Sequence, residues 1–307
     1  MSAFLLSGLL VVAAAASAGE AQPAGRSAPA AVARPNMLVT TEWLSQHLRD
    51  ADLVVLHVAN AAQFNAGHIA GSRRVGLADV SSAPGPDKLT LEMLTPEQIA
   101  AWAESQGIGD RSRVVIVPHN DTLQSATRVF LTLAYFGAID RVSLLDGGFK
   151  AWTAEGRETP VAEPGQPARV KFTPHVRPEL LASLEQVEAA TLDRRASIVD
   201  ARLPRFYEGN GGGFPRPGHL PTAVNIPLNT VSLATGHLRA PAELRKLFVD
   251  AGVADGKPVV TYCHIGQQAS LLWFVATMLG YEARMFDGSF QQWSGTERLP
   301  VVVPPGK

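Results

Sequence analysis

Short runs of β-branched and aliphatic residues alternate along most of this chain with longer segments that have the apolar pattern of helices. The runs at 52–58, 114–117, 197–200 and 258–262 are rich in Val, Ile and Leu, as expected for buried strands. Apolar segments at 125–136 and 269–279 have the length of helices, and Gly280 ends the second. Strands that alternate with helices in this way predict an α/β fold with mostly parallel sheets.

The pattern occurs twice, which predicts two domains. The first copy holds the strand 52–58, the motif GHIAG at 67–71, the strand 114–117 and LDGGFKAW at 145–152. The second holds SIVDAR at 197–202, GHLP at 218–221, the strand 258–262 and FDGSFQQW at 286–293. A stretch crowded with prolines separates the copies. We therefore expect domains at 36–157 and 179–305, each a central, mostly parallel sheet flanked by helices, with a linker at 158–178.

The single cysteine, Cys263, follows the predicted strand 258–262 and precedes the predicted helix 269–279. This position directs backbone N–H groups and the positive end of a helix dipole toward the sulfur, so we expect the pKa of the thiol to be lowered. A free cysteine is more often a small buried apolar residue. The tight turn allowed by Gly266 favours a catalytic cysteine instead. The first copy has no thiol: we expect Asn120 opposite Cys263 and His57 opposite Asp200.

Composition narrows the function classes. The net charge of −1 gives no sign of a nucleic-acid or membrane-surface binding protein, and one cysteine allows no internal disulfide and no zinc site built from several thiolates.

The amino terminus has the pattern of a secretory signal. An apolar run at 3–16 is followed by Ala16-Ser17-Ala18, which predicts a signal peptide at 1–18 and a flexible leader at 19–35. No Lys or Arg precedes the apolar run, and an uncleaved anchor is the alternative. We expect export to the periplasm, without stable membrane association after cleavage. An unpaired thiol in an oxidising compartment either forms an intermolecular disulfide or has a functional role.

In their duplicated order, these motifs resemble the rhodanese family of sulfurtransferases in its tandem two-domain form, over about residues 36–303. The resemblance implies a parallel five-stranded sheet in each domain and an active cysteine in the second domain only. It implies that Cys263 takes a sulfane sulfur from thiosulfate or 3-mercaptopyruvate, holds it as a persulfide and passes it to cyanide or a thiol. The partners would be a small sulfur donor and acceptor, and neither cofactor nor metal is expected.

The remaining site residues follow from this resemblance and from charge. The loop amides are expected to stabilise the anionic sulfur; the residues are His264, Ile265, Gly266, Gln267, Gln268 and Ala269. Arg202 and Arg205 follow the strand at 197–200, at the sheet edge where α/β proteins bind ligands, and are candidates for binding the donor's anionic end. The loop has neither the basic residues usual for thiosulfate nor the small residues usual for mercaptopyruvate. Arg216 and the glycines at 211–213 are a further possible source of charge.

Three other interpretations require different chemistry at Cys263. A cysteine phosphatase needs an arginine six residues after the cysteine, where this chain has Ala269. A metal site at Cys263 and His264 lacks further ligands at suitable spacing. A persulfide carrier that delivers sulfur to a partner protein, without turnover, stays open.

Overall fold

The computed structural model describes Met1 and residues 34–85, 89–162, 165–254 and 256–303. The predicted signal peptide, beyond Met1, and most of the predicted leader lie outside the described residues. The described residues from 34 to 303 belong to one compact unit. In the part of the chain that is described, no helix is both long and apolar enough to cross a membrane.

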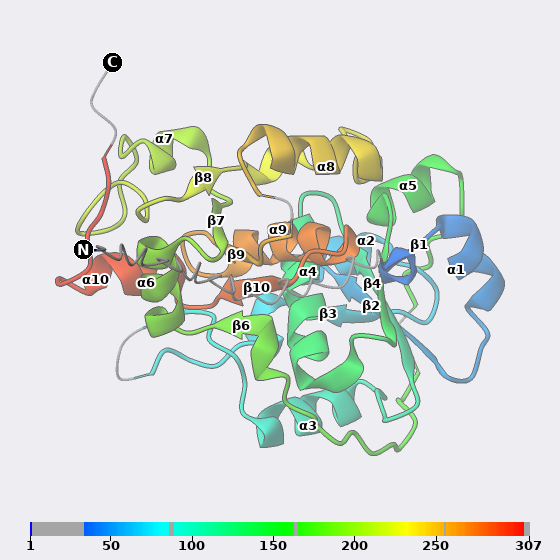
Figure 1. The fold of residues 1–307 in the computed structure, drawn as a ribbon. Coiled ribbons are helices and arrows are strands. Elements are labelled where there is room, and N and C mark those ends of the chain that lie inside the picture. Colours follow the sequence, from blue (N-terminus) through cyan, green and yellow to red (C-terminus); the bar gives the residue numbers. More distant parts are fainter. Residues whose placement is uncertain (2–33, 86–88, 163–164, 255, 304–307) are drawn as a thin grey trace. The chain divides into compact units, whose positions relative to one another are not determined.

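The elements follow in two similar series (Figure 1). The first series consists of η1 (Pro35–Met37), β1 (Leu38–Val39), α1 (Thr41–His47), β2 (Leu53–Val58), α2 (Ala61–Ala66), β3 (Arg73–Val75), η2 (Leu77–Asp79), α3 (Pro96–Ser105), β4 (Arg113–Pro118), α4 (Leu123–Leu133), η3 (Ala134–Ala138), β5 (Val142–Leu145) and α5 (Gly148–Ala154). The second consists of η4 (Pro178–Leu180), β6 (Leu181–Ala182), α6 (Leu184–Asp193), β7 (Ser197–Asp200), α7 (Pro204–Tyr207), β8 (Val224–Asn225), η5 (Leu228–Thr230), α8 (Pro241–Asp250), β9 (Val259–Tyr262), α9 (Gln267–Met278), β10 (Ala283–Phe286) and α10 (Ser289–Gly295). The described residues between α5 and η4 form no helix or strand.

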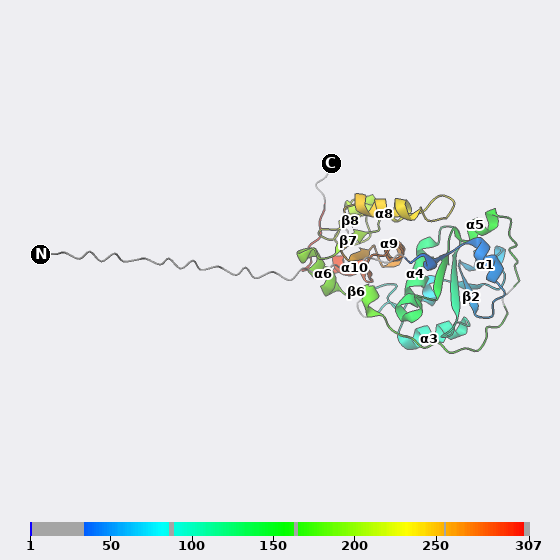
Figure 2. The same ribbon diagram turned by 45° about the vertical axis from the view of Figure 1, so that its right-hand side comes forward.

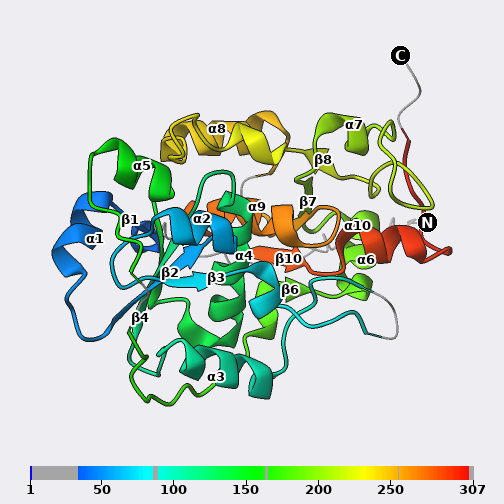
Figure 3. The same cartoon turned by 180° about the vertical axis from the view of Figure 1, so that it is seen from behind.

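Each series forms a five-stranded sheet, and the two sheets have the same strand order. The orders are β1-β5-β4-β2-β3 and β6-β10-β9-β7-β8, and all pairings within them are parallel. Figure 3 shows β3 at the near edge of the first sheet. The predicted α/β architecture of two domains, each with a central parallel sheet, is confirmed.

One apolar core is continuous through both domains, and each domain has a second core on the other face of its sheet. The shared core includes the buried faces of α4 and α9, which pack side by side (Figure 2). The outer core of the first sheet lies under α1 and α5, and that of the second lies under α6 and α10. Because side chains alternate across a strand, neighbouring residues of one strand enter different cores: Val199 faces the shared core and Ile198 the outer one. Cys263 belongs to the shared core, close to the contact between domains.

Candidate active site

Cys263 follows β9, whose neighbours in the sheet are β7 and β10. Helix α9 begins at Gln267, so only three residues separate the cysteine from the helix. Gly266 adopts a left-handed conformation with φ +86°, and a Cβ atom there would lie 2.9 Å from the Asp287 carbonyl oxygen. The turn therefore needs glycine, because a side chain would be strained and would collide with backbone.

Four backbone N–H groups surround the sulfur of Cys263. The amides of Ile265, Gly266, Gln268 and Ala269 donate hydrogen bonds to it. The thiol is fully buried, and burial raises its pKa, although the four amides act in the opposite direction. The predicted lowering of the pKa is therefore wrong in sign: desolvation of the anion exceeds the gain from the amides. The amides still offset part of the cost of burying the anion.

The other two predicted loop residues use their side chains elsewhere. His264 Nδ1 lies 3.2 Å from Gln268 Oε1. Gln267 Nε2 donates to Ser125 Oγ of the first domain at 2.9 Å. His264 therefore connects two residues of the loop, and Gln267 connects the loop to the first domain.

The start of α10 holds the first two residues of this loop. The Cys263 amide donates to Ser289 Oγ at 3.2 Å, and the Phe290 amide donates to the Cys263 carbonyl oxygen at 3.0 Å. The Gln291 amide donates to the His264 carbonyl oxygen at 3.0 Å. The beginning of the loop is therefore attached to the segment that follows β10.

Arg202 is part of a buried ion pair with Asp200. Its Nη2 atom lies 2.6 Å from Asp200 Oδ2 and 2.7 Å from the Gly218 carbonyl oxygen, and Nε lies 3.0 Å from Asp200 Oδ1. The guanidinium carbon lies 4.1 Å from the centre of the Phe290 ring, and Arg202 is 1% exposed. Because its charge is already neutralised at close range, Arg202 is better suited to support the site than to bind a donor from solvent.

Arg205, on α7, is exposed and lies over the ring of Phe206, with 4.6 Å between the guanidinium carbon and the ring centre. Among the described residues it forms no salt bridge. Burial lowers the pKa of His264, and the nearby charges of Arg202 and Arg205 lower it further. Arg205 is thus close enough to the loop to affect it while its charge stays open to solvent.

Arg216 has a structural role that the sequence did not reveal. It donates hydrogen bonds to backbone carbonyl oxygens at and after the end of α10; these belong to Trp293, Ser294, Thr296, Glu297 and Leu299. Capping a helix end in this way satisfies carbonyl groups that lack helical partners. Arg216 is therefore not the source of charge suggested above.

Two aromatic residues beside the loop were missed in the sequence. Phe206 meets the His264 ring edge to face at 4.6 Å between centres, and Phe214 stacks on it at 5.7 Å. Phe214 directly follows the glycines at 211–213, and this was the available signal. A neutral imidazole between two phenyl rings gives the loop an apolar neighbour.

The first domain has no thiol at the corresponding place. Val114 and Val259 occupy equivalent positions, because Val114 pairs with Val142 as Val259 pairs with Ala283. The residue four positions later is Pro118 in the first domain and Cys263 in the second. The expectation of Asn120 opposite Cys263 is therefore wrong.

His57 does stand opposite Asp200, since His57 pairs with Val117 as Asp200 pairs with Tyr262. It is fully buried, its Nε2 atom lies 3.1 Å from His119 Nδ1, and burial lowers its pKa to about 3. Within the described residues, no group of three or more His, Cys, Asp or Glu side chains is arranged to hold a metal ion.

Comparison with known proteins identifies the family to which both domains belong. A family model described as a rhodanese-like domain matches residues 40–155 and 179–296. The chain is 29% identical over 288 residues to the sulfur carrier protein TtuD of Thermus thermophilus, covering 88% of this chain and 98% of that protein. It is 31% identical over 282 residues to a thiosulfate sulfurtransferase of Corynebacterium glutamicum, covering 88% of this chain and 91% of that one.

Solved structures share the fold. SseA from Escherichia coli, described as a 3-mercaptopyruvate sulfotransferase, superposes with a TM-score of 0.73 at 24% identity, covering 83% of this chain and 98% of that one. An anaerobic ergothioneine biosynthesis enzyme from Chlorobium limicola gives a TM-score of 0.77 at 21% identity, covering 88% of this chain and 71% of that one. At these identities the likeness concerns the fold alone.

Proposed function

The chain belongs to the rhodanese family of sulfurtransferases, and we propose that it moves a sulfane sulfur from thiosulfate, through a persulfide on Cys263, to cyanide or a small thiol. One observation supports the choice of residue above all others. The only sulfur nucleophile of the chain has four backbone N–H groups directed at it.

The reaction takes two displacement steps. The Cys263 thiolate attacks the outer sulfur of thiosulfate, a sulfur–sulfur bond forms, and the donor's own sulfur–sulfur bond breaks to release sulfite with the electron pair. The acceptor, cyanide or a thiolate, then attacks the terminal sulfur of the persulfide. Thiocyanate or a new persulfide leaves, and the Cys263 thiolate is restored. No other cysteine exists in the chain to intercept the persulfide as a disulfide.

The amides supply the stabilisation that a buried anion needs. Burial raises the pKa of the resting thiol and so favours its protonated form. The amides of Ile265, Gly266, Gln268 and Ala269 become effective when negative charge forms on the sulfur, as in an oxyanion hole. The amides thus lower the cost of forming the anion, although burial still favours the resting thiol.

Arg205 is our candidate for attracting the donor. Thiosulfate is a dianion, and residues 263–269 include no Lys or Arg. The exposed guanidinium of Arg205 adjoins the loop through Phe206 and His264, while Arg202 supports the loop from within. The thiosulfate sulfurtransferase of Corynebacterium glutamicum supports thiosulfate as donor over 3-mercaptopyruvate.

A persulfide carrier is the second candidate, favoured by the similarity to the sulfur carrier protein TtuD. Steady-state formation of thiocyanate from thiosulfate and cyanide separates the two. We expect many turnovers per molecule, with thiosulfate used better than 3-mercaptopyruvate. A single loading followed by no further product would instead identify a carrier.

We also propose export. The sequence pattern at 1–18 supports cleavage after Ala18 and release into the periplasm. Cell fractionation with amino-terminal sequencing of the recovered protein tests this. A chain that begins at Met1 in the cytoplasmic fraction would contradict it.

A further inference from the structure

Helices α4 and α9 come from different domains, and their first turns meet beside the cysteine loop. Ser270 Oγ lies 2.9 Å from Thr127 Oγ1 and donates to the Gln124 carbonyl oxygen at 3.2 Å. The loop residue Gln267 donates to Ser125 at 2.9 Å. The domain without a cysteine therefore contacts the loop directly.

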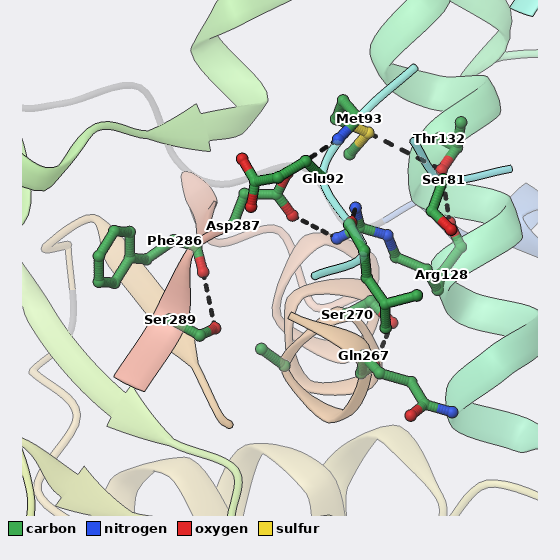
Figure 4. A network of polar contacts seen from close by, with 12 residues as sticks. Ser81, Glu92, Met93, Arg128, Thr132, Gln267, Ser270, Phe286, Asp287 and Ser289 are labelled. Atoms are coloured by element: carbon green, nitrogen blue, oxygen red, sulfur yellow. Dashed lines mark hydrogen bonds and ion pairs between the residues drawn. The ribbon is translucent and has the colours of Figure 1, made fainter. Parts of the chain in front are cut away.

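Arg128, on α4, reaches from the first domain to a residue of the second. Its side chain is completely buried and forms an ion pair with Asp287 (Figure 4). It also donates a hydrogen bond to the Leu91 carbonyl oxygen. Asp287 also accepts a hydrogen bond from the Met93 amide at 3.3 Å. A buried arginine that bridges two domains is costly to desolvate, so its position calls for a reason.

The ion pair adjoins the turn of the cysteine loop. A Cβ atom at Gly266 would lie 3.0 Å from Arg128 Nη1 and 2.9 Å from the Asp287 carbonyl oxygen, so both residues touch the loop at its glycine. Asp287 also precedes Ser289 and Phe290, which hold the backbone of Cys263. Fixing Asp287 therefore fixes the loop at its turn and at its beginning.

The two domains place corresponding aspartates at this interface, but they differ at the position of the arginine. Asp146 of the first domain corresponds to Asp287 of the second, since each lies four residues after the first paired residue of β5 or β10. Asp146 accepts a hydrogen bond from the Leu238 amide at 3.0 Å. Counted back from Gly137 and Gly280, the position of Arg128 in α4 corresponds to Leu271 in α9. Each aspartate thus accepts a hydrogen bond from an amide of the other domain. The buried guanidinium of Arg128 pairs with Asp287, the aspartate of the domain that holds Cys263.

We propose that Arg128, in the domain without a cysteine, is a positioning residue for the Cys263 loop. It acts through Asp287 and Gly266, and it keeps the amides of Ile265, Gly266, Gln268 and Ala269 directed at the sulfur. This inference deepens the proposed function, on which it rests for the role of Cys263.

The test measures the pH dependence of Cys263 alkylation by iodoacetamide in Arg128→Met, with Asp146→Asn as the matched control. If the amides lose alignment, the midpoint of the profile rises by about one pH unit, a tenfold smaller thiolate fraction at fixed pH. The kcat for thiosulfate falls at least about tenfold while KM changes little, since the loss concerns charge that develops on the sulfur. Arg128→Lys, which keeps a cation near Asp287, recovers part of both effects. Asp146→Asn leaves the midpoint and kcat unchanged, even if its melting temperature falls.

A lower melting temperature in Arg128→Met with an unchanged alkylation midpoint would overturn the proposal, because the ion pair would then serve domain docking only. If Arg128→Met does not fold, Arg128→Met/Asp287→Asn replaces it, since no unpaired charge stays buried, and the same midpoint decides. The alkylation profile needs no sulfur donor. It therefore stays readable even if the wild type fails to accept sulfur from thiosulfate, and the two failures are distinct.

Discussion

The buried ion pair of Arg202 and Asp200 gives a quantitative prediction that separates support of the site from donor binding. Arg202→Met keeps most of the side-chain volume and removes the charge. Asp200, which is fully buried, then loses both guanidinium nitrogens that contact its carboxylate. Leaving one partner of a buried pair uncompensated costs about 3–5 kcal/mol of unfolding free energy.

Urea unfolding at pH 7, followed by tryptophan fluorescence, measures this cost. Arg202→Met/Asp200→Asn has no unpaired charge, and we expect it to recover at least half of the loss. Steady-state kinetics with thiosulfate on the folded fraction should show little change in donor KM, because Arg202 is not open to solvent. The reasoning is refuted if Arg202→Met unfolds within about 1 kcal/mol of the wild type while its donor KM rises tenfold or more. Arg202 would then bind the donor itself.

Three further predictions concern charge. Arg205→Ala should raise the thiosulfate KM about threefold to tenfold, as for loss of an exposed charge worth about 0.7–1.4 kcal/mol, and should leave stability unchanged. Initial rates at varied ionic strength check this, and an unaltered KM would show that Arg205 does not bind the donor. The folded-state pKa of His57 is about 3, below the unfolded value, so the unfolded chain binds more protons between these values and stability falls as pH falls through this range. Urea unfolding should show about 2 kcal/mol lost between pH 7 and pH 5 from this residue, and His57→Asn should flatten the slope; an equal slope in both proteins would contradict the assignment. Because burial raises the pKa of the Cys263 thiol, wild-type alkylation by iodoacetamide should still accelerate above the free-thiol pKa of about 8.5, and a plateau at neutral pH would show that the amides outweigh burial.

Much of the fold could be predicted because its signals are local. The β-branched runs mark β2, β4, β7 and β9, and the repeated motifs identify the two domains without any long-range information. The cysteine between a strand and a helix, with Gly266 in the turn, indicated where backbone amides would point.

The incorrect predictions concern features that depend on contacts between residues far apart in the sequence. The pKa direction of Cys263 depends on complete burial, which the shared core of both domains produces and a local motif does not reveal. The expectation of Asn120 failed because the loop of the first domain is longer: Ala126 follows Pro118 by eight residues, and Ala269 follows Cys263 by six. Arg128 was missed because its partner, Asp287, is 159 residues away along the chain.

The central claim is that Cys263 is the atom-transfer site, and intact-protein mass spectrometry tests it most directly. The wild type is treated with thiosulfate, desalted, and divided into two samples, one of which receives cyanide. We expect the sample without cyanide to carry the added mass of one sulfur atom on the Cys263 peptide. The sample that receives cyanide should lose this added mass. Cys263→Ser should gain nothing under the same conditions. No added sulfur in the wild type, or the same added mass in Cys263→Ser, would contradict the account.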